Sequence, residues 1–346
     1  MLLVLRFAGA GRIVAAALLL VLAGCAGKPA PTPASRPTVA VPVVNPDAFA
    51  AWLGGVRQDA AAQGVSQPTL DKALDHLQPI PEVLVLDSKQ PEFTLTFVQY
   101  RDRTVTDQRV AAGRQMLDEY RPLLEQVGKA YGVEPRFIVA LWGVETDYGR
   151  FTGGYPVVGS LATLAYGSGR KDMFRAELLD ALRILDRKDI APELMTGSWA
   201  GAMGQTQFMP SSFLRYAVDF QGGGHPDIWT KQADVFASIA NYLARSGWQV
   251  SQGWGRAVIL PPGFSEQLID WKTDRSIEEW RRLGLRNADG GELAAGPPAA
   301  LVAPDGPGGS AYLTNGNFKV IMKWNRSTYF AASVGLLADR IGEPAS

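Results

Sequence analysis

The chain has 346 residues, and its 34 lysine and arginine side chains balance its 34 aspartate and glutamate side chains. This neutrality argues against a general nucleic-acid binder, which would carry an excess of positive charge, and a hydrophobic content of 47% excludes a wholly disordered chain. With two histidines and one cysteine, the sequence supports neither a Cys/His zinc cluster nor an internal disulfide. The length predicts about two domains, at roughly 150 residues each.

Residues 1–24 are predicted to be a lipoprotein signal peptide. The apolar run Ile13–Ala23 suits the core of a secretory signal and is too short to span a bilayer. It leads into Leu22–Cys25, which resembles the bacterial lipobox, so Cys25 is the expected site of lipidation. The alternative is an ordinary buried cysteine. Ala26 follows where an inner-membrane retention signal typically has aspartate, so we expect an outer-membrane lipoprotein that faces the periplasm.

Residues 25–47 are expected to form a tether between the lipid and the folded part of the chain. Six prolines lie in this stretch, and a proline-rich chain is extended and poorly able to build a core. From Phe49 to Ile80, apolar residues recur at helical spacing, with Gly64 as a break. We assign residues 48–100 to an N-terminal helical region.

Residues 101–250 are predicted to be the main helical body. A long amphipathic stretch runs from Asp107 to Tyr131, and Gly132 ends it. A further helix opens with Pro135 in its first turn and continues through Thr146. More helices are predicted along the chain at residues 171–187, 211–218, 232–246 and 327–341.

The composition changes between residues 251 and 317. Glycine and proline recur there, Ala257–Leu260 and Ala300–Ala303 are β-prone, and residues 304–306 mark a turn. We predict a small β-containing lobe, after which residues 318–346 return to the body as a C-terminal helix. The predicted fold class is therefore mainly α.

Glu145 stands out on its predicted helix. The positions three, four and seven residues earlier, on the same face, are Trp142, Leu141 and Ile138. A carboxylate on an apolar stripe loses hydration, which raises its pKa, and a carboxyl that is protonated near neutral pH is what a general acid needs. The alternative is an exposed glutamate at a helix end, offset by Arg150.

The segment Gly197–Phe213 is rich in glycine, neutral polar side chains and aromatic rings. Ser198, Gln205 and Gln207 offer neutral hydrogen-bond donors and acceptors, and Trp199 offers a flat apolar face. This combination suits sugars, whose hydroxyls need hydrogen bonds and whose C–H faces pack on rings. The alternative is a tight loop between helices.

Six segments occur along the chain in the order found in one family: Gly143–Gly149, Gly197–Phe213, Val218–Phe220, Ala240–Tyr242, Gly247–Trp248 and Trp324–Tyr329. Together they resemble the membrane-bound lytic murein transglycosylase B family, periplasmic enzymes that cut the glycan strands of peptidoglycan. The resemblance covers nearly the whole mature chain. It implies a lysozyme-like helical core with an additional helical domain and a small β domain.

The resemblance also implies a reaction, the non-hydrolytic cleavage of the β-1,4 bond between N-acetylmuramic acid and N-acetylglucosamine. Glu145 would take the family's acid/base position, and the product would carry a 1,6-anhydro ring. This chemistry needs one carboxylate, whereas the usual glycosidase needs two, and Asp147 would point to a different helix face. Two alternatives stay open, a hydrolytic muramidase on the same fold and a non-catalytic peptidoglycan-binding lipoprotein.

Other family positions imply a groove for the sugar chain. Trp324 stands where relatives often have tyrosine. The expected partners are peptidoglycan strands and, through the lipid, the outer membrane; we expect a monomer that binds no nucleic acid. The residues that match positions of the groove are Ser198, Gln207, Asn325, Tyr100 and Tyr242.

Members of this family can hold calcium in a loop that resembles an EF-hand, and the matching stretch is Asp219–Asp227. Calcium needs several oxygen ligands, usually carboxylates at alternating early positions of the loop. Gln221 and Gly223 occupy the second and third of these positions, which leaves Asp219 and Asp234. We therefore expect no tight metal site, and no cofactor.

Overall fold

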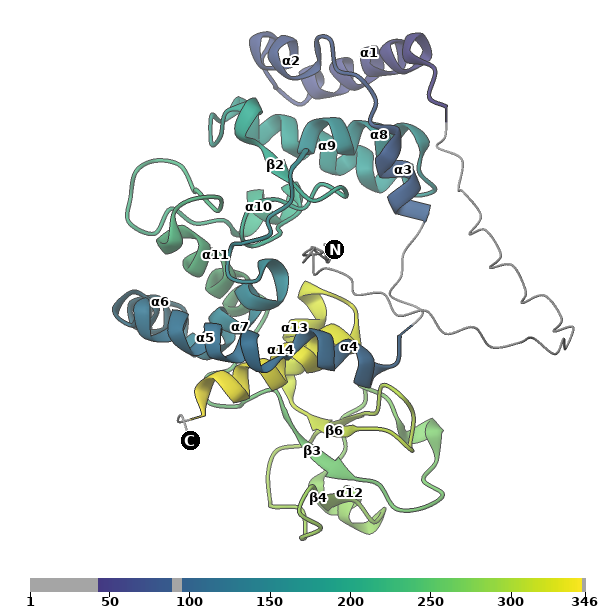
Figure 1. Ribbon diagram of the computed structural model, residues 1–346, viewed down its shortest axis with the longest axis vertical. Helices are drawn as coiled ribbons and strands as arrows, with labels where there is room; N and C mark the ends of the chain where they lie inside the picture. Colours follow the sequence, from purple (N-terminus) through teal and green to yellow (C-terminus); the bar gives the residue numbers. More distant parts are fainter. Residues whose placement is uncertain (1–42, 89–94, 344–346) are drawn as a thin grey trace, which may run out of the picture. The chain divides into compact units, whose positions relative to one another are not determined.

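The computed structural model describes residues 43–88 and 95–343 (Figure 1). The predicted signal peptide, Cys25 and the predicted tether up to residue 42 lie outside these ranges. Within the ranges, we find no helix with the length and apolar character that a membrane crossing requires.

Helices make up more than half of the described residues, which confirms the predicted mainly-α fold. Two small β-sheets accompany them in the described ranges. The α-helices are α1 (Pro46–Ala62), α2 (Gln67–Leu74), α3 (Pro81–Ser88), α4 (Phe97–Thr104), α5 (Asp107–Glu119), α6 (Arg121–Tyr131), α7 (Pro135–Thr146), α8 (Val157–Gly167), α9 (Lys171–Asp186), α10 (Pro210–Tyr216), α11 (Gln232–Arg245), α12 (Ile277–Arg282), α13 (Gly316–Trp324) and α14 (Thr328–Gly342).

Helix α7 confirms the helix predicted from Pro135 to Thr146. The proline occupies its first turn, where a missing N–H breaks no helical bond. Helices α5, α6, α11 and α14 pack around α7 (Figure 1), and the residues from Phe137 to Gly143 are buried among them. Trp142 is one of the largest fully buried side chains of this core. The packing therefore fixes where the C-terminal end of α7 lies.

The amphipathic stretch predicted as one helix over Asp107–Tyr131 is two helices. Helix α5 ends at Glu119, and α6 begins at Arg121. Pro122 explains the break, because in a continuous helix it would have no N–H for the carbonyl of Asp118 and its ring would clash with that carbonyl. Gly132 ends α6 in the left-handed conformation, with φ 67°, at the predicted position.

A second core lies between α8, α9, α10 and the N-terminal helices α1 to α3. Helix α8 is missing from the predicted helices because it is apolar on all sides. Its residues from Val157 to Ala165 are buried, so its sequence shows no amphipathic period. Helix α1 begins at Pro46, inside the predicted tether, because the side chain of Asn45 accepts two N–H groups of its first turn.

The strands are β1 (Tyr155–Pro156), β2 (Thr196–Gly197), β3 (Gly255–Ile259), β4 (Arg286–Asn287), β5 (Ala300–Val302) and β6 (Ala311–Thr314). The larger sheet has the order β4-β3-β6-β5, with antiparallel neighbours throughout. With α12 it encloses a small core around Trp280 (Figure 1). Asp305, in the predicted turn, accepts the backbone N–H of Phe97 at 2.7 Å. This bond ties the sheet's turn to the start of α4.

Candidate active site

Glu145 lies in the last turn of α7. Its neighbours on the predicted apolar stripe, Ile138, Leu141 and Trp142, are buried. Glu145 itself keeps partial contact with solvent, and its carboxyl is sheltered by protein. Burial raises the pKa of this carboxyl from 4.5 to about 7. An acid with such a pKa can both give and take a proton near neutral pH.

Within the described ranges, the carboxyl of Glu145 has one hydrogen-bond partner, the indole of Trp324. Nε1 of Trp324 donates to Oε1 of Glu145 at 2.6 Å. The bond favours the ionised carboxylate, so it lowers the pKa of Glu145 and offsets part of the effect of burial. Trp324 ends α13 and lies 179 residues from Glu145 in the chain. The only sequence signal for it is its place in a family segment.

Asp147, the neighbouring acid, has other partners. Its Oδ1 accepts a hydrogen bond from Nε of Arg109 at 3.2 Å, and its Oδ2 lies 3.4 Å from the guanidinium of Arg150. Arg150 therefore pairs with Asp147 and not with Glu145, contrary to the exposed-glutamate alternative. The backbone helps to separate the two acids, because α7 ends before Asp147, and Asp147 and Tyr148 have left-handed φ values of 51° and 62°.

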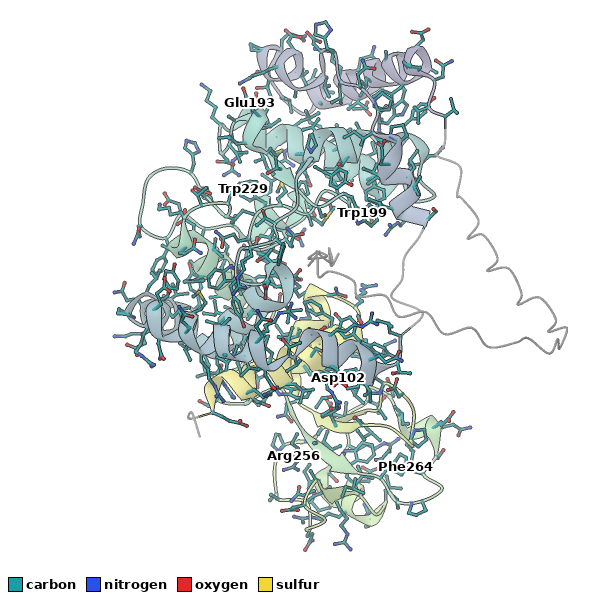
Figure 2. All side chains as sticks on the ribbon, in the orientation of Figure 1. Asp102, Glu193, Trp199, Trp229, Arg256 and Phe264 are labelled. Atoms are coloured by element: carbon teal, nitrogen blue, oxygen red, sulfur yellow. The ribbon has the colours of Figure 1, made fainter. Side chains whose placement is uncertain are left out.

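Ser198 lies in a tight turn that follows β2. Its Oγ accepts the N–H of Ala202 at 3.1 Å, and its own N–H donates to the Ala202 carbonyl at 2.8 Å. The hydroxyl hydrogen takes part in neither bond, so it can donate to a ligand. Gly153 packs closely on this turn: a Cβ atom added to Gly153 would lie 2.1 Å from the carbonyl oxygen of Gly197, so a larger residue would not fit there. Trp199, labelled in Figure 2, follows on the same turn.

Gln205 and Gln207 are close in sequence and differ in role. The amide of Gln205 is buried and accepts a hydrogen bond from the indole of Trp142 at 2.9 Å, so it joins the loop to α7. Gln207 has a left-handed φ of 50°, and its amide nitrogen donates to the carbonyls of Thr152 and Gly204 at 3.0 and 2.9 Å. No described residue donates to Oε1 of Gln207. That oxygen is therefore available to a ligand.

Asn325 is exposed at the end of α13, next to Trp324. Its Oδ1 accepts the N–H of Ser327 at 3.1 Å. It lines a hollow of about 550 Å³ at the junction of α13 and α14. The other residues around this hollow are Leu95, Trp271, Met322, Arg326, Ser327, Thr328 and Tyr329.

The two predicted tyrosines pack on aromatic neighbours. The ring of Tyr242 lies 4.7 Å from the ring of Trp324, and its hydroxyl donates to the carbonyl of Lys323 at 2.7 Å. Tyr100 lies on α4, with its ring 5.9 Å from that of Tyr329. Tyr242 is nearly buried, so the contribution visible in the structure is support of the Trp324 ring.

A lysine side chain reaches into the loop that the family resemblance associates with calcium. Nζ of Lys231 lies 3.0 Å from Oδ1 of Asp219 and 3.5 Å from Oδ2 of Asp234. The backbone N–H groups of Gly223 and Gly224, followed by Lys231, lower the pKa of the Asp219 carboxyl to about 2. Among the described side chains, no group of three or more carboxylates, histidines or cysteines is arranged to bind a metal. The residues present do not fit calcium, because an ammonium group already bridges the two carboxylates.

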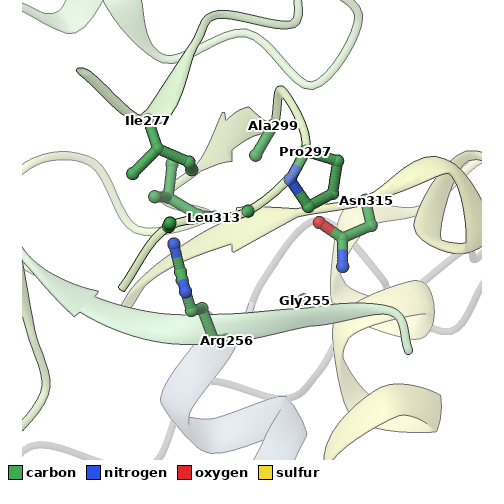
Figure 3. Close-up of a pocket in the computed structure, with 9 residues that line it drawn as sticks. Gly255, Arg256, Ile277, Pro297, Ala299, Leu313 and Asn315 are labelled. Carbon is green, nitrogen blue, oxygen red and sulfur yellow. The ribbon is translucent and has the colours of Figure 1, made fainter. Parts of the chain in front are cut away.

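A separate hollow of about 120 Å³ lies beside the larger sheet (Figure 3). Arg256 of β3 and Asn315 help to line it, and the guanidinium of Arg256 donates to the Ala294 carbonyl at 3.1 Å. None of the predicted site residues lines this hollow. We therefore assign it no part in the candidate site.

Comparison with known proteins gives consistent matches along most of the chain. Residues 48–339 match the family model described as "Transglycosylase SLT domain". The sequence is 30% identical to membrane-bound lytic murein transglycosylase B of Escherichia coli (strain K12), over 94% of this chain and 95% of that protein. SltB3 from Pseudomonas aeruginosa, solved in complex with NAG-anhNAM-pentapeptide, is 42% identical with a TM-score of 0.81, over 85% of this chain and 79% of SltB3. Slt35 from Escherichia coli, solved in complex with calcium, is 30% identical with a TM-score of 0.72, over 85% of this chain and 92% of Slt35. These neighbours confirm the predicted lysozyme-like fold.

Proposed function

The chain belongs to the transglycosylase SLT domain family, as its sequence motifs indicate, and we propose that Glu145 is the catalytic acid and base of a peptidoglycan lytic transglycosylase. The product is glycan with 1,6-anhydromuramoyl ends. The observation that carries this proposal is a sheltered carboxyl with a pKa of about 7, bonded to Trp324. A group that acts first as an acid and then as a base works best when its pKa lies near the working pH.

One carboxyl group accounts for both halves of the reaction. Protonated Glu145 gives its proton to the oxygen that links C1 of N-acetylmuramic acid to N-acetylglucosamine, and the C1–O bond breaks. The carbonyl oxygen of the substrate's own 2-acetamido group stabilises the positive charge that develops at C1. The Glu145 carboxylate then takes the proton of the muramoyl 6-hydroxyl while that oxygen bonds to C1. Glu145 regains its proton and no water is consumed, so the second carboxylate of a usual glycosidase is not needed.

The hydrogen-bonding groups of Ser198, Gln207 and Asn325 suit a glycan strand. The Ser198 hydroxyl and the Asn325 amide nitrogen can donate, since their oxygens already accept backbone N–H groups. Gln207 can only accept, because its amide nitrogen donates to two carbonyls. Sugar hydroxyls and N-acetyl groups supply matching acceptors and donors. We assign these three residues to substrate binding, with Tyr100 and Tyr242 as aromatic side chains of the same groove.

The protein is further proposed to be an outer-membrane lipoprotein that faces the periplasm and acts as a monomer on peptidoglycan. The lipobox-like sequence around Cys25 supports this, and the relative from Escherichia coli is named as membrane-bound. The proposed organisation keeps the predicted signal peptide at 1–24 and shortens the tether to 25–45, because α1 begins at Pro46. A helical region up to residue 100, a lysozyme-like catalytic core at 101–250 and a β-containing lobe at 251–317 follow. The returning C-terminal part, predicted as one helix at 318–346, contains α14 and most of α13.

Mass spectrometry of purified sacculi digested with the protein tests this function. Anhydro-muropeptides are the expected product, whereas reducing-end muropeptides would show a hydrolase and the absence of soluble product would show a non-catalytic binder. Glu145→Gln should bind sacculi and release nothing, because glutamine has no acidic proton to give. Glu125→Gln, at an exposed position of α6, is the matched control and should digest sacculi like the wild type.

A further inference from the structure

The indole of Trp324 meets Glu145 from a fixed direction, with Nε1 at 2.6 Å from Oε1. The Trp324 ring packs against the rings of Phe208 and Tyr242, whose centroids lie 5.2 and 4.7 Å away. The Tyr242 hydroxyl also holds the carbonyl of Lys323, the residue before Trp324. Both the ring and the backbone that carries it are therefore restrained.

An indole N–H donates a hydrogen bond and has no lone pair with which to accept one. In a protonated carboxyl group the carbonyl oxygen is a better hydrogen-bond acceptor than the hydroxyl oxygen, whose hydrogen and C–O bonding leave it less electron-rich. The bond from Trp324 therefore favours Oε1 of Glu145 as the oxygen without the proton. A tyrosine hydroxyl at position 324 could accept as well as donate, and it would impose no such choice.

We propose that Trp324 is a positioning residue that keeps the catalytic proton of Glu145 on Oε2. The inference rests on the proposed function of Glu145 as acid and base. In the first half of the reaction Oε2 gives its proton to the glycosidic oxygen. In the second half the same Oε2 takes the proton of the muramoyl 6-hydroxyl, while Oε1 stays bonded to Trp324. One atom thus loses and regains the proton, and the carboxyl does not rotate between the two halves.

The charged groups around Glu145 have partners of their own, so the indole governs the placement of its proton. On the turn after α7, Asp147 pairs with Arg109 and Arg150. On α13, Nζ of Lys323 donates to a backbone carbonyl at 2.7 Å. Arg326, ahead of α14, is exposed. The other buried or partly buried charged side chains of α7 and the helices packed on it, each bonded to a group other than Glu145, are Arg114, Glu134, Arg136, Asp234, Asp339 and Arg340.

Trp324→Phe removes the N–H and keeps an aromatic ring. The ionised form of Glu145 then loses its donor, so we expect the alkaline limb of the pH profile of kcat/KM to move up by roughly one pH unit. Trp324→Tyr restores a donor and should return the limb toward the wild-type position. Trp52→Phe makes the same replacement on α1, where the ring packs on Phe49 and Tyr166; it is the control and should leave the limb in place. A limb that does not move in Trp324→Phe would overturn the inference.

A second measurement needs no variant. Neutron diffraction from wild-type crystals, grown in heavy water at an acidic pH, locates the deuteron of the Glu145 carboxyl. We expect it on Oε2, and a deuteron on Oε1 would contradict the proposed role of Trp324. In that case wild-type digestion of sacculi and an inactive Glu145→Gln would still support the proposed function, so the two failures are distinguishable.

Discussion

Replacement of Glu145 by glutamine should stabilise the folded protein, and increasingly so as the pH rises from 4.5 to about 7. The fold raises the pKa of this carboxyl from 4.5 to about 7, because the ionised form is poorly solvated there. Between these values the folded state binds more protons than the unfolded chain, so the wild-type protein loses stability as the pH rises. Glutamine stays neutral and does not incur this loss.

The size of the effect follows from the shift in pKa. Each unit corresponds to about 1.36 kcal/mol, so the rise from 4.5 to about 7 corresponds to about 3 kcal/mol of unfolding free energy once Glu145 is ionised. Partial contact of Glu145 with solvent makes this an upper bound. For a chain of this length it amounts to roughly 5 °C in melting temperature. At pH values below 4.5 the two proteins should melt alike.

Differential scanning calorimetry of the wild type and Glu145→Gln, in steps from about pH 4 to about pH 9, measures this difference. Glu125→Gln removes an exposed carboxylate from α6 and should change the melting temperature little at any pH. If the wild type and Glu145→Gln melted together at alkaline pH, Glu145 would not be desolvated in the folded protein. The physical reasoning for a raised pKa would then be refuted.

Four further outcomes are expected. Because Glu145 must be protonated to begin the reaction, kcat/KM for muropeptide release should fall about tenfold for each pH unit above 7. Calcium should leave the melting temperature of the wild type unchanged, since Lys231 already bridges two carboxylates; a rise in melting temperature with submillimolar calcium would contradict this expectation. Lys231→Met should lower the melting temperature, because it removes the bridging ammonium group. Gly143→Ala should lower the unfolding free energy in urea by roughly 1–3 kcal/mol, because its Cβ would lie 2.7 Å from the ring of Tyr148. Cys25→Ala should move the protein from the membrane fraction to the soluble fraction after cell fractionation.

The parts of the fold that could be predicted are the helices with local signals at their ends. Pro135 marks the start of α7 because its ring fixes φ at a helical value, and Gly132 marks the end of α6 because glycine readily adopts the left-handed backbone found there. The break at Pro122 is also encoded locally, but it is masked by an amphipathic pattern that continues across it. Helix α8 could not be recognised from periodicity, since a helix buried on every side has no polar face to alternate with its apolar one.

The apolar surroundings of Glu145 could be predicted from its own helix, whereas its hydrogen bond from Trp324 could not. Glu145 is marked by apolar residues within seven positions of it, so one helical face is enough to single it out. The bond from Trp324 depends on tertiary packing across 179 residues, which no local pattern encodes. The contact of Lys231 with Asp219 was missed for the same reason, although it spans only 12 residues of the chain. A count of carboxylates in the loop omits a lysine 12 residues after Asp219 that reaches back to it.

In the proposed mechanism, the strained turn after α7 helps one acid to serve both halves of the reaction. A second ionised carboxylate beside Glu145 would raise its pKa further and disfavour the ionised form that the second half requires. Left-handed backbone at Asp147 and Tyr148 ends the helix at once, and the Asp147 carboxylate bonds to Arg109 instead. Such backbone costs about 1–2 kcal/mol for each residue, and the buried Tyr148 ring, whose hydroxyl donates to the Arg109 carbonyl at 2.7 Å, holds it in place. Burial and the Trp324 bond are then left to set the proton affinity of Glu145.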